Sequence, residues 1–289
     1  MATWYAQSSS VNIESDSLWN SAADGSGSAL TWANLGASDI LEANGKTALA
    51  ITADLTCGQL QTLSGGGFTV SLATANRRIA ANLLAGTTTC LTRSSTTYTL
   101  TIGGNVTGGS AANACGLAGT DANGTIIEGG VTGGSASSAF GVGRGAIYGV
   151  MSVGGTVTAG TAGAAIEMSY QGTATITGNL VASGAIAAVV PYSDYYTLVL
   201  SGSIVCSALG VFPCRGASGV RIKWSGASSG ATISMRDSSL VEKIAKVPDY
   251  PAAADVKSGV AFDYTTKTGT LSSGGGGPII GCGFIRGAK

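Results

Sequence analysis

A seven-residue phrase returns along the middle of the chain at a nearly constant interval, and this period limits the available folds more than any other feature. The phrase begins at Gly104, Gly129, Gly154, Gly178 and Gly202, so successive copies start about 24 residues apart. Its first three copies read GNVTGGS, GGVTGGS and GGTVTAG. Such a period, punctuated by glycine, predicts a repeat architecture whose units must stack on one another to bury their apolar faces.

Each repeat also holds two strand-like segments. Before the phrase, bulky apolar residues alternate with small or polar ones, which is typical of strands with one buried face. Three short strands per repeat predict a three-sided β-solenoid, because about 24 residues at ~3.3 Å each can circle a narrow prism once. Repeats rich in Gly and Thr, without apolar spacings of three and four, do not favour a helical array. The segments before the phrase are 99–102, 125–128, 150–153, 173–177 and 197–200, and those after it are 114–117, 139–142, 165–168, 188–190 and 211–214.

The repeat divides the chain into three predicted parts. Residues 40–240 are expected to form an all-β, parallel β-helix of about eight coils, roughly 40 Å long. Right-handed winding is inferred from the general preference for right-handed crossovers. Residues 1–39 are predicted to be an N-terminal cap or attachment segment, and residues 241–289 a β-rich tail.

Large aromatic residues gather in the first part of the chain. Trp4, Tyr5, Trp19 and Trp32 all lie in the predicted cap, and the chain has four tryptophans in total. They could cover the open edge of the first coil, since an unpaired strand edge invites aggregation. They could equally form an attachment surface for a partner, where Trp and Tyr are favoured anchors.

Charge and composition exclude several classes of function. The chain has no histidine, which rules out Ser-His-Asp and Cys-His nucleophiles and a His-ligated zinc site. The 15 basic and 15 acidic residues balance, so no basic surplus predicts nucleic-acid binding. A local patch of Arg77, Arg78 and Arg93 is the one exception. The N-terminus lacks the features of a secretion signal and no apolar run is long enough to span a bilayer, so we expect a protein made in the cytoplasm and used without membrane insertion.

The six cysteines show no CxxC spacing. We predict that they fill the solenoid interior as small apolar residues. Cys90 and Cys115 are separated by one repeat period, so they could stack in neighbouring coils, although a disulfide is not the expectation. No Asp-rich calcium cluster occurs in the sequence, and no cofactor is predicted.

Carboxylates within the regular coils are the candidates for glycan cleavage, which needs a paired set. They are Glu128, Glu167, Asp121 and Asp194. Glu128 and Glu167 are predicted on different sides of their coils, and no two candidates share a column. We interpret each as an outer-face or turn residue and predict no catalytic residue.

Tyrosines cluster at one predicted coil corner. Tyr192, Tyr195 and Tyr196 lie there beside Asp194. This corner is a candidate contact for a ligand, with packing between subunits as the plainer role.

Three segments resemble known families. Residues 39–51 (DILEANGKTALAI) resemble the opening coil of right-handed parallel β-helix proteins. The phrase PAAADVKSGV at 251–260, with TGT at 268–270, resembles an element near the C-terminus of many uncharacterised phage and bacterial structural proteins. Members of these families often begin with a segment similar to WNSAADGSG at 19–27.

The resemblance implies a bacteriophage virion protein with a β-helix body and assigns no catalytic residue. We expect a non-enzymatic capsid decoration protein or short head fibre, located in the virion, whose partners are capsid or other virion proteins. Flat, charge-poor outer faces predict a homotrimer. One alternative is a tail-fibre or tailspike adhesin that contacts host glycan through Tyr192, Tyr195 and Tyr196. A glycan-cleaving β-helix enzyme is the other.

Overall fold

The computed structural model describes most of the chain from Met1 to Cys206 and a few strands beyond it. The chain separates into two compact units, residues 1–247 and 248–289. The predicted cap, residues 1–39, belongs to the first unit, and the unit boundary lies close to the predicted start of the tail. The described residues are 1–8, 11–16, 18–46, 48–65, 67–72, 74–93, 97–119, 124–136, 139–143, 149–161, 163–168, 172–182, 189–191, 196–202, 204–206, 210–213, 221–224, 232–236, 242–246, 261–262 and 267–268.

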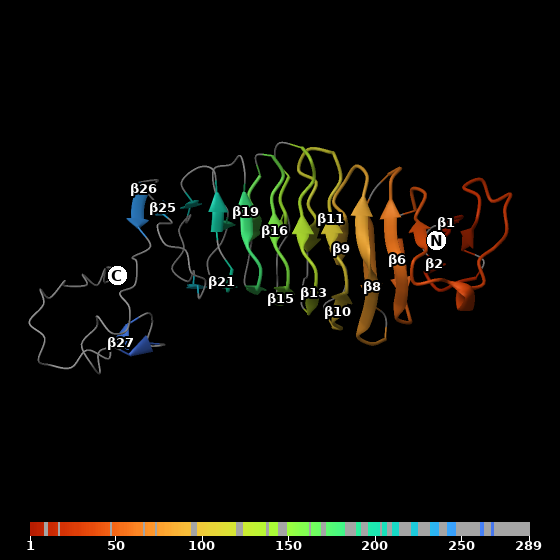
Figure 1. Ribbon diagram of the computed structural model, residues 1–289, viewed down its shortest axis with the longest axis horizontal. Helices are drawn as coiled ribbons and strands as arrows, with labels where there is room; N and C mark the ends of the chain where they lie inside the picture. The colour runs from red at the N-terminus through yellow and green to blue at the C-terminus, as the bar shows by residue number, and fades with distance from the viewer. Residues whose placement is uncertain are drawn as a thin grey trace, which may run out of the picture. The chain divides into compact units, whose positions relative to one another are not determined.

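Parallel strands of the first unit stack in three columns, one on each side of the coil, which we call faces 1, 2 and 3 (Figure 1). Strand β8 (Arg77–Ala85) spans two faces, because its first half pairs with face 1 and its second half with face 2. Face 1 continues through β10 (Leu100–Ile102), β13 (Thr125–Ile127), β15 (Gly149–Val153), β18 (Gly172–Ile176), β21 (Tyr196–Leu200) and β24 (Arg221–Trp224).

Face 2 follows face 1 in every coil, and face 3 completes the circuit. Face 2 contains β4 (Ile40–Glu42), the second half of β6 (Leu55–Thr62), the end of β8, β11 (Val106–Thr107), β14 (Val131–Thr132), β16 (Val157–Thr158), β19 (Leu180–Ala182) and β22 (Ile204–Cys206). Face 3 contains β5 (Ala48–Ile51), β7 (Phe68–Leu72), β9 (Leu91–Arg93), β12 (Leu117–Gly119), β17 (Ile166–Met168) and β20 (Val189–Pro191). Isolated bridges from Leu117 to Val142 and from Val142 to Ile166 connect β12 to β17.

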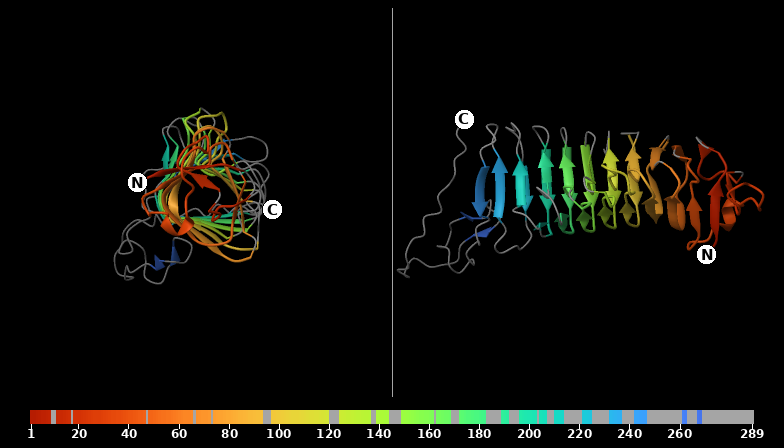
Figure 2. Two further views of the ribbon diagram at one scale, coloured as in Figure 1. Left: turned by 90° about the vertical axis from the view of Figure 1, so that its right-hand side faces the viewer. Right: turned by 90° about the horizontal axis from the view of Figure 1, so that it is seen from above.

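This topology confirms the predicted all-β, three-sided parallel β-solenoid. Viewed along the stack, the coils overlie one another around a shared interior (Figure 2). Within the described residues, the one helical element is a 3-10 turn, η1 (Trp32–Asn34). The right-handed winding stays a prediction, and the expected total of about eight coils includes segments outside the described residues.

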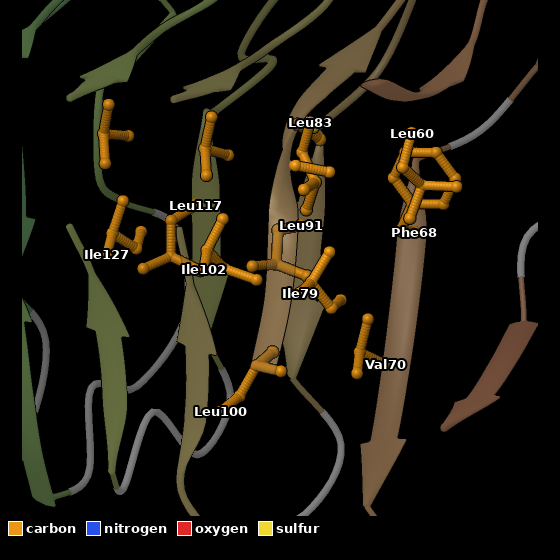
Figure 3. Close-up of a cluster of buried hydrophobic side chains, with 14 of the residues drawn as sticks. Leu60, Phe68, Val70, Ile79, Leu83, Leu91, Leu100, Ile102, Leu117 and Ile127 are labelled. Atoms are coloured by element: carbon orange, nitrogen blue, oxygen red, sulfur yellow. The ribbon is translucent and has the colours of Figure 1, made fainter. Parts of the chain in front are cut away.

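Alternation along each strand places apolar side chains in continuous interior columns. On face 2 the inward column runs through Leu83, Val106, Val131, Val157 and Leu180, each at most 1% exposed. Figure 3 shows side chains from successive coils meeting in this interior. Because burial of one such side chain is worth roughly 1.5–3 kcal/mol, the stacked columns are the main source of stability.

The strand register corrects the predicted alignment of the third repeat by one residue. The interval from Gly104 to Gly129, repeated once more, predicts that Val131 pairs with Thr156, but Val131 pairs with Val157. The glycine that lies against Gly129 in the next coil is therefore Gly155 and not Gly154. An unchanged interval would have placed Thr156 in the interior and Val157 outside, because side chains alternate along a strand. The next interval, from Val157 to Leu180, is correspondingly shorter.

Asparagine and aspartate side chains connect successive coils at their turns. The amide nitrogen of Asn105 donates to Oδ1 of Asn82 over 2.9 Å, and the nitrogen of Gly130 donates to Oδ1 of Asn105 over 2.7 Å. Asp54 accepts in the same way from the nitrogen of Arg78 at 2.9 Å. These side chains satisfy backbone donors at the turns, where the strand ladders end.

The N-terminal segment covers the open end of the stack. Strand β1 (Thr3–Ala6) pairs in parallel with β4 and antiparallel with β3 (Trp19–Asn20). Strand β2 (Val11–Asn12) pairs with β5 at the corresponding end of face 3. This pairing protects strand edges that would otherwise bind another chain.

The parallel stack ends with a change of direction. Strand β25 (Thr232–Arg236) pairs in parallel with β23 (Gly210–Pro213), whereas β26 (Glu242–Lys246) returns antiparallel to β25. In the second unit the described strands are β27 (Ala261–Phe262) and β28 (Lys267–Thr268), which form an antiparallel pair. Strand β27 follows the phrase at 251–260, which lies outside the described residues, and β28 includes Thr268 of the TGT segment.

Candidate functional site

Trp19 is part of the interior of the cap and does not contribute to an exposed surface. Its side chain is fully buried, and its Nε1 donates to the carbonyl oxygen of Ile13 over 2.7 Å. This burial corrects the prediction that Trp19 is an attachment residue. A buried indole with a satisfied N–H stabilises the cap, and a partner could reach it only after the cap opened.

The other three predicted attachment aromatics remain partly accessible. Trp4, Tyr5 and Trp32 are half-buried, and Trp4 and Trp32 pack against the core. Trp4 also donates its Nε1 to Oδ2 of Asp39 over 3.3 Å. An attachment surface at this end would therefore use Trp4, Tyr5 and Trp32, with their outer edges available for contact.

Asp39 ties the first residues of the chain to the cap. Its Oδ1 accepts from the nitrogen of Ala2 at 2.7 Å, and its Oδ2 from the nitrogen of Gly36 at 3.1 Å. The N-terminal amine of Met1 lies 3.8 Å from Oδ1. The hydrogen bond from Ala2, with those from Gly36 and Trp4, holds the pKa of Asp39 below its usual value of 3.8, although burial opposes this shift.

The predicted tyrosine corner lies mostly outside the described residues. This applies to Tyr192, Asp194 and Tyr195, and to the side chain of Tyr196. The backbone of Tyr196 begins β21 and pairs with Gly172 of β18.

The two described carboxylates from the glycan-cleavage set lie on different faces. Glu128 follows β13 on face 1 and is exposed, whereas Glu167 lies in β17 on face 3 and is 8% exposed. The guanidinium of Arg78 binds Glu128 through both nitrogens, with Nη2 to Oε2 at 2.6 Å, and this contact lowers the pKa of Glu128. Asp121, like Asp194, lies outside the described residues.

The arginines do not form the predicted basic patch. Arg93 is fully buried, because alternation in β9 places it on the interior side with Leu91. Its Nη2 donates to the carbonyl oxygen of Tyr98 over 2.7 Å, and burial lowers its pKa. Arg78 is paired with Glu128 across two coils and Arg77 is half-buried. The three arginines are therefore one half-buried, one neutralised and one fully buried cation.

The described cysteines fill the interior as predicted. Cys57, Cys90 and Cys115 are buried thiols, so Cys90 and Cys115 are not joined by a disulfide. Burial raises the pKa of Cys57 and of Cys90 to about 12. At neutral pH both are therefore unreactive thiols that act as small apolar side chains.

A shallow groove lies along the corner between faces 2 and 3. It has a volume of about 500 Å³ and crosses successive coils at the end of the repeated phrase. We call it the corner groove, and it is lined by Ala85, Gly86, Thr107–Ser110, Thr132–Ser135 and Ala159–Thr161. In the sequence these glycines predicted only turns. The recurrence of Gly-Gly-Ser in register on one face was the signal that could have revealed the groove.

The floor of the groove is backbone, because neighbouring coils approach too closely for side chains. A Cβ atom on Gly134 would overlap the carbonyl oxygen of Gly109, and one on Gly160 would overlap that of Gly134. Hydroxyl groups form the rim, where Ser110 Oγ donates to the oxygen of Gly86 and Thr161 Oγ1 to the oxygen of Ser135, each over 3.1 Å. The groove therefore presents neutral hydrogen-bonding groups and no ionised side chain.

The described part of the chain contains no cluster of three His, Cys, Asp or Glu residues that could hold a metal ion. It also contains no helix long and apolar enough to cross a membrane. Comparison with known protein families, characterised proteins and solved structures found no match to this chain.

Proposed function

We propose that this chain is a non-enzymatic structural protein of a bacteriophage particle, which reinforces the capsid surface or forms a short fibre on it. The virion is its site of action, and capsid or other virion proteins are its partners. It would associate as a homotrimer and attach through Trp4, Tyr5 and Trp32 at the capped end.

The observation that carries this proposal is the structure of the WNSAADGSG segment, whose sequence resembles the opening of phage structural proteins. The turn-forming residues of the segment, which are Asn20, Asp24, Gly25 and Gly27, each have a defined structural role in the cap. Asn20 donates Nδ2 to the oxygens of Gly25 and Gly27, over 3.2 and 3.0 Å, and accepts from the nitrogen of Ala22 at 2.9 Å. Asp24 accepts from the nitrogen of Ser26 at 3.0 Å.

Backbone conformation accounts for the two glycines of this segment. Gly25 has φ of +80°, which L side chains rarely adopt, and a Cβ on Gly27 would overlap Ser21 Oγ. The motif is thus a folding unit that closes the loop after Trp19. The segment thereby helps to assemble the cap, which is the end expected to attach.

Quantitative mass spectrometry of purified particles tests the proposal, with the major capsid protein as internal standard. A copy number comparable with that of the capsid protein is expected for a decoration protein. A few copies per particle would move the protein to the tail or to a single vertex. Absence from purified particles would overturn the proposal.

A further inference from the structure

Charged side chains are separated by sign along the stack. Residues 1–54 contain six acidic side chains and one basic one, residues 55–214 contain four of each, and residues 215–247 contain six basic and two acidic. The first and last of these segments lie at opposite ends of the first unit, because strand pairing runs from β1 and β4 to β24, β25 and β26 (Figure 1). One end of the unit therefore carries a net side-chain charge of −5 and the other of +4.

The acidic charge lies at the capped end, beside the accessible aromatics. Asp16 and Asp24 are exposed, and no Lys or Arg of the described residues forms an ion pair with either of them. Oδ1 of Asp16 accepts from the backbone nitrogen of Trp32 at 2.5 Å, and Asp39 accepts from Nε1 of Trp4. Carboxylates and aromatic side chains thus share one surface at this end.

The basic end is formed by the last strands of the stack. Arg221 and Lys223 belong to β24, Arg236 to β25, and Lys243 and Lys246 to β26. Among the described strands, β26 pairs with β25 alone and is the last strand of its sheet. Three of the five residues of β26 are charged, and charged edge strands resist the addition of another strand. A contact at this end is therefore expected to depend on charge and not on strand pairing.

The two ends are too far apart to neutralise each other within one chain. Eight strand-to-strand steps lead from β4 to β24, which is roughly 40 Å at ~4.8 Å per step. The Debye length is about 8 Å at physiological ionic strength, so each end is screened from the other. Both ends can therefore attract an opposite charge on another molecule.

A second copy of this chain accounts for both charged ends. The acidic end of one copy complements the basic end of the next, and the two net charges are nearly equal in size. A foreign partner at one end would leave the opposite charge at the other end unexplained. The contact joins two different surfaces, so it is heterologous and can be repeated by further copies.

We propose that copies of this protein associate end to end, with the acidic capped end of one copy on the basic end of the next, formed by β24, β25 and β26. The proposal rests on the short-fibre form of the proposed function, in which the capped end is the attaching end. It names a second copy as a partner of that end. Opposite charges steer the two ends together and give the chain of copies one direction.

Sedimentation velocity of the full chain at low and high ionic strength tests this contact. In about 0.01 M salt, where the Debye length is ~30 Å, the average mass should rise steadily with protein concentration. In about 1 M salt, where the Debye length is ~3 Å, that rise should disappear. A rise that stops at twice the mass found in high salt would indicate a closed antiparallel pair and would overturn the end-to-end arrangement. A mass that does not depend on salt would overturn it too.

Neutralising variants locate the contact. Asp16→Asn with Asp24→Asn removes two charges at the capped end but keeps an oxygen that can accept from the backbone. Because exposed ion pairs are weak, this change should reduce the association constant by about 2- to 30-fold. The control, Thr132→Lys with Thr177→Lys, makes the same change of net charge at exposed positions in the middle of the stack and should associate as the wild type does. Equal weakening in the two variants would refute a contact made by the ends.

A mixing experiment identifies which ends meet. One chain carries Asp16→Lys with Asp24→Lys, and a second chain carries Lys243→Glu with Lys246→Glu. Each should associate poorly with itself, whereas the mixture contains an intact acidic end from one chain and an intact basic end from the other and should associate again. If the mixture stays dissociated while circular dichroism shows both variants folded, the inference is wrong. Copy number in purified particles tests the proposed function separately, so either can fail without the other.

Discussion

Replacing Thr125 by valine is expected to stabilise this protein. Thr125 is fully buried in the inward column of face 1, between Leu100 and Met151 of the neighbouring coils, and its Oγ1 has no hydrogen-bond partner. Burying a hydroxyl without a partner costs about 1–3 kcal/mol. Valine has nearly the same shape and also favours strands. Thr125→Val should therefore raise the free energy of unfolding by about 1–2 kcal/mol.

Two companion variants separate this effect from general changes in the strand. Leu100→Thr introduces a hydroxyl one coil away in the same column, where Leu100 is fully buried. It should lower the free energy of unfolding by about 2–4 kcal/mol, since methyl groups are lost and a hydroxyl is buried. Thr101→Val changes a half-exposed outward position of the same strand, β10, and should be neutral within about 0.5 kcal/mol.

The assay is urea unfolding followed by circular dichroism, supported by hydrogen exchange of the β13 amides. A stabilised variant shifts the midpoint without changing the dependence on urea concentration. Slower exchange at Ile126 and Ile127 would locate the gain in the expected coil. If Thr125→Val proved less stable than wild type by more than about 0.5 kcal/mol, the hydroxyl must have a partner in solution, and the account of a dry interior column would be refuted.

The contacts between coils lead to three further predictions. Gly134→Ala should lower the free energy of unfolding by about 3 kcal/mol or more in urea unfolding, because the added Cβ overlaps the backbone of Gly109. The control Thr132→Ala on the same coil should have little effect on stability. Equal losses of stability in the two variants would contradict the explanation by backbone overlap. Asn105→Ala should cost about 1 kcal/mol and speed exchange of the Gly130 amide, whereas Asn105→Asp keeps the acceptor oxygen and should exchange as wild type does. Because the folded-state pKa of Asp39 is lowered, its stabilising contribution is complete above the ordinary value of 3.8 and is lost as pH falls through the folded pKa. Exchange at residues 3–6 should accelerate over that acidic range in the wild type; the same acceleration in Asp39→Asn, which cannot be protonated there, would refute the assignment.

The glycine-punctuated period was sufficient to predict the solenoid. A stack of short strands is the arrangement that buries the alternating apolar residues of every repeat at once, so the three-face topology follows from local pattern. Interior cysteines followed from the same logic, since Cys is among the residues most often buried. Alternation along β9 also indicates that Arg93 lies on the same inward side as Leu91. This indication conflicts with the general expectation that arginine side chains are exposed.

Sequence by itself determined the fold class and the strands, because these depend on a strand alternation and a repeat period that any local window displays. Tertiary structure alone decided the one-residue shift that places Gly155 above Gly129, since only pairing between coils selects which valine faces the interior. It also decided the burial of Trp19, the pairing of Arg78 with Glu128 and the formation of the corner groove. Each of these joins residues from different coils or turns, and their separation in space depends on stacking contacts that no single repeat contains.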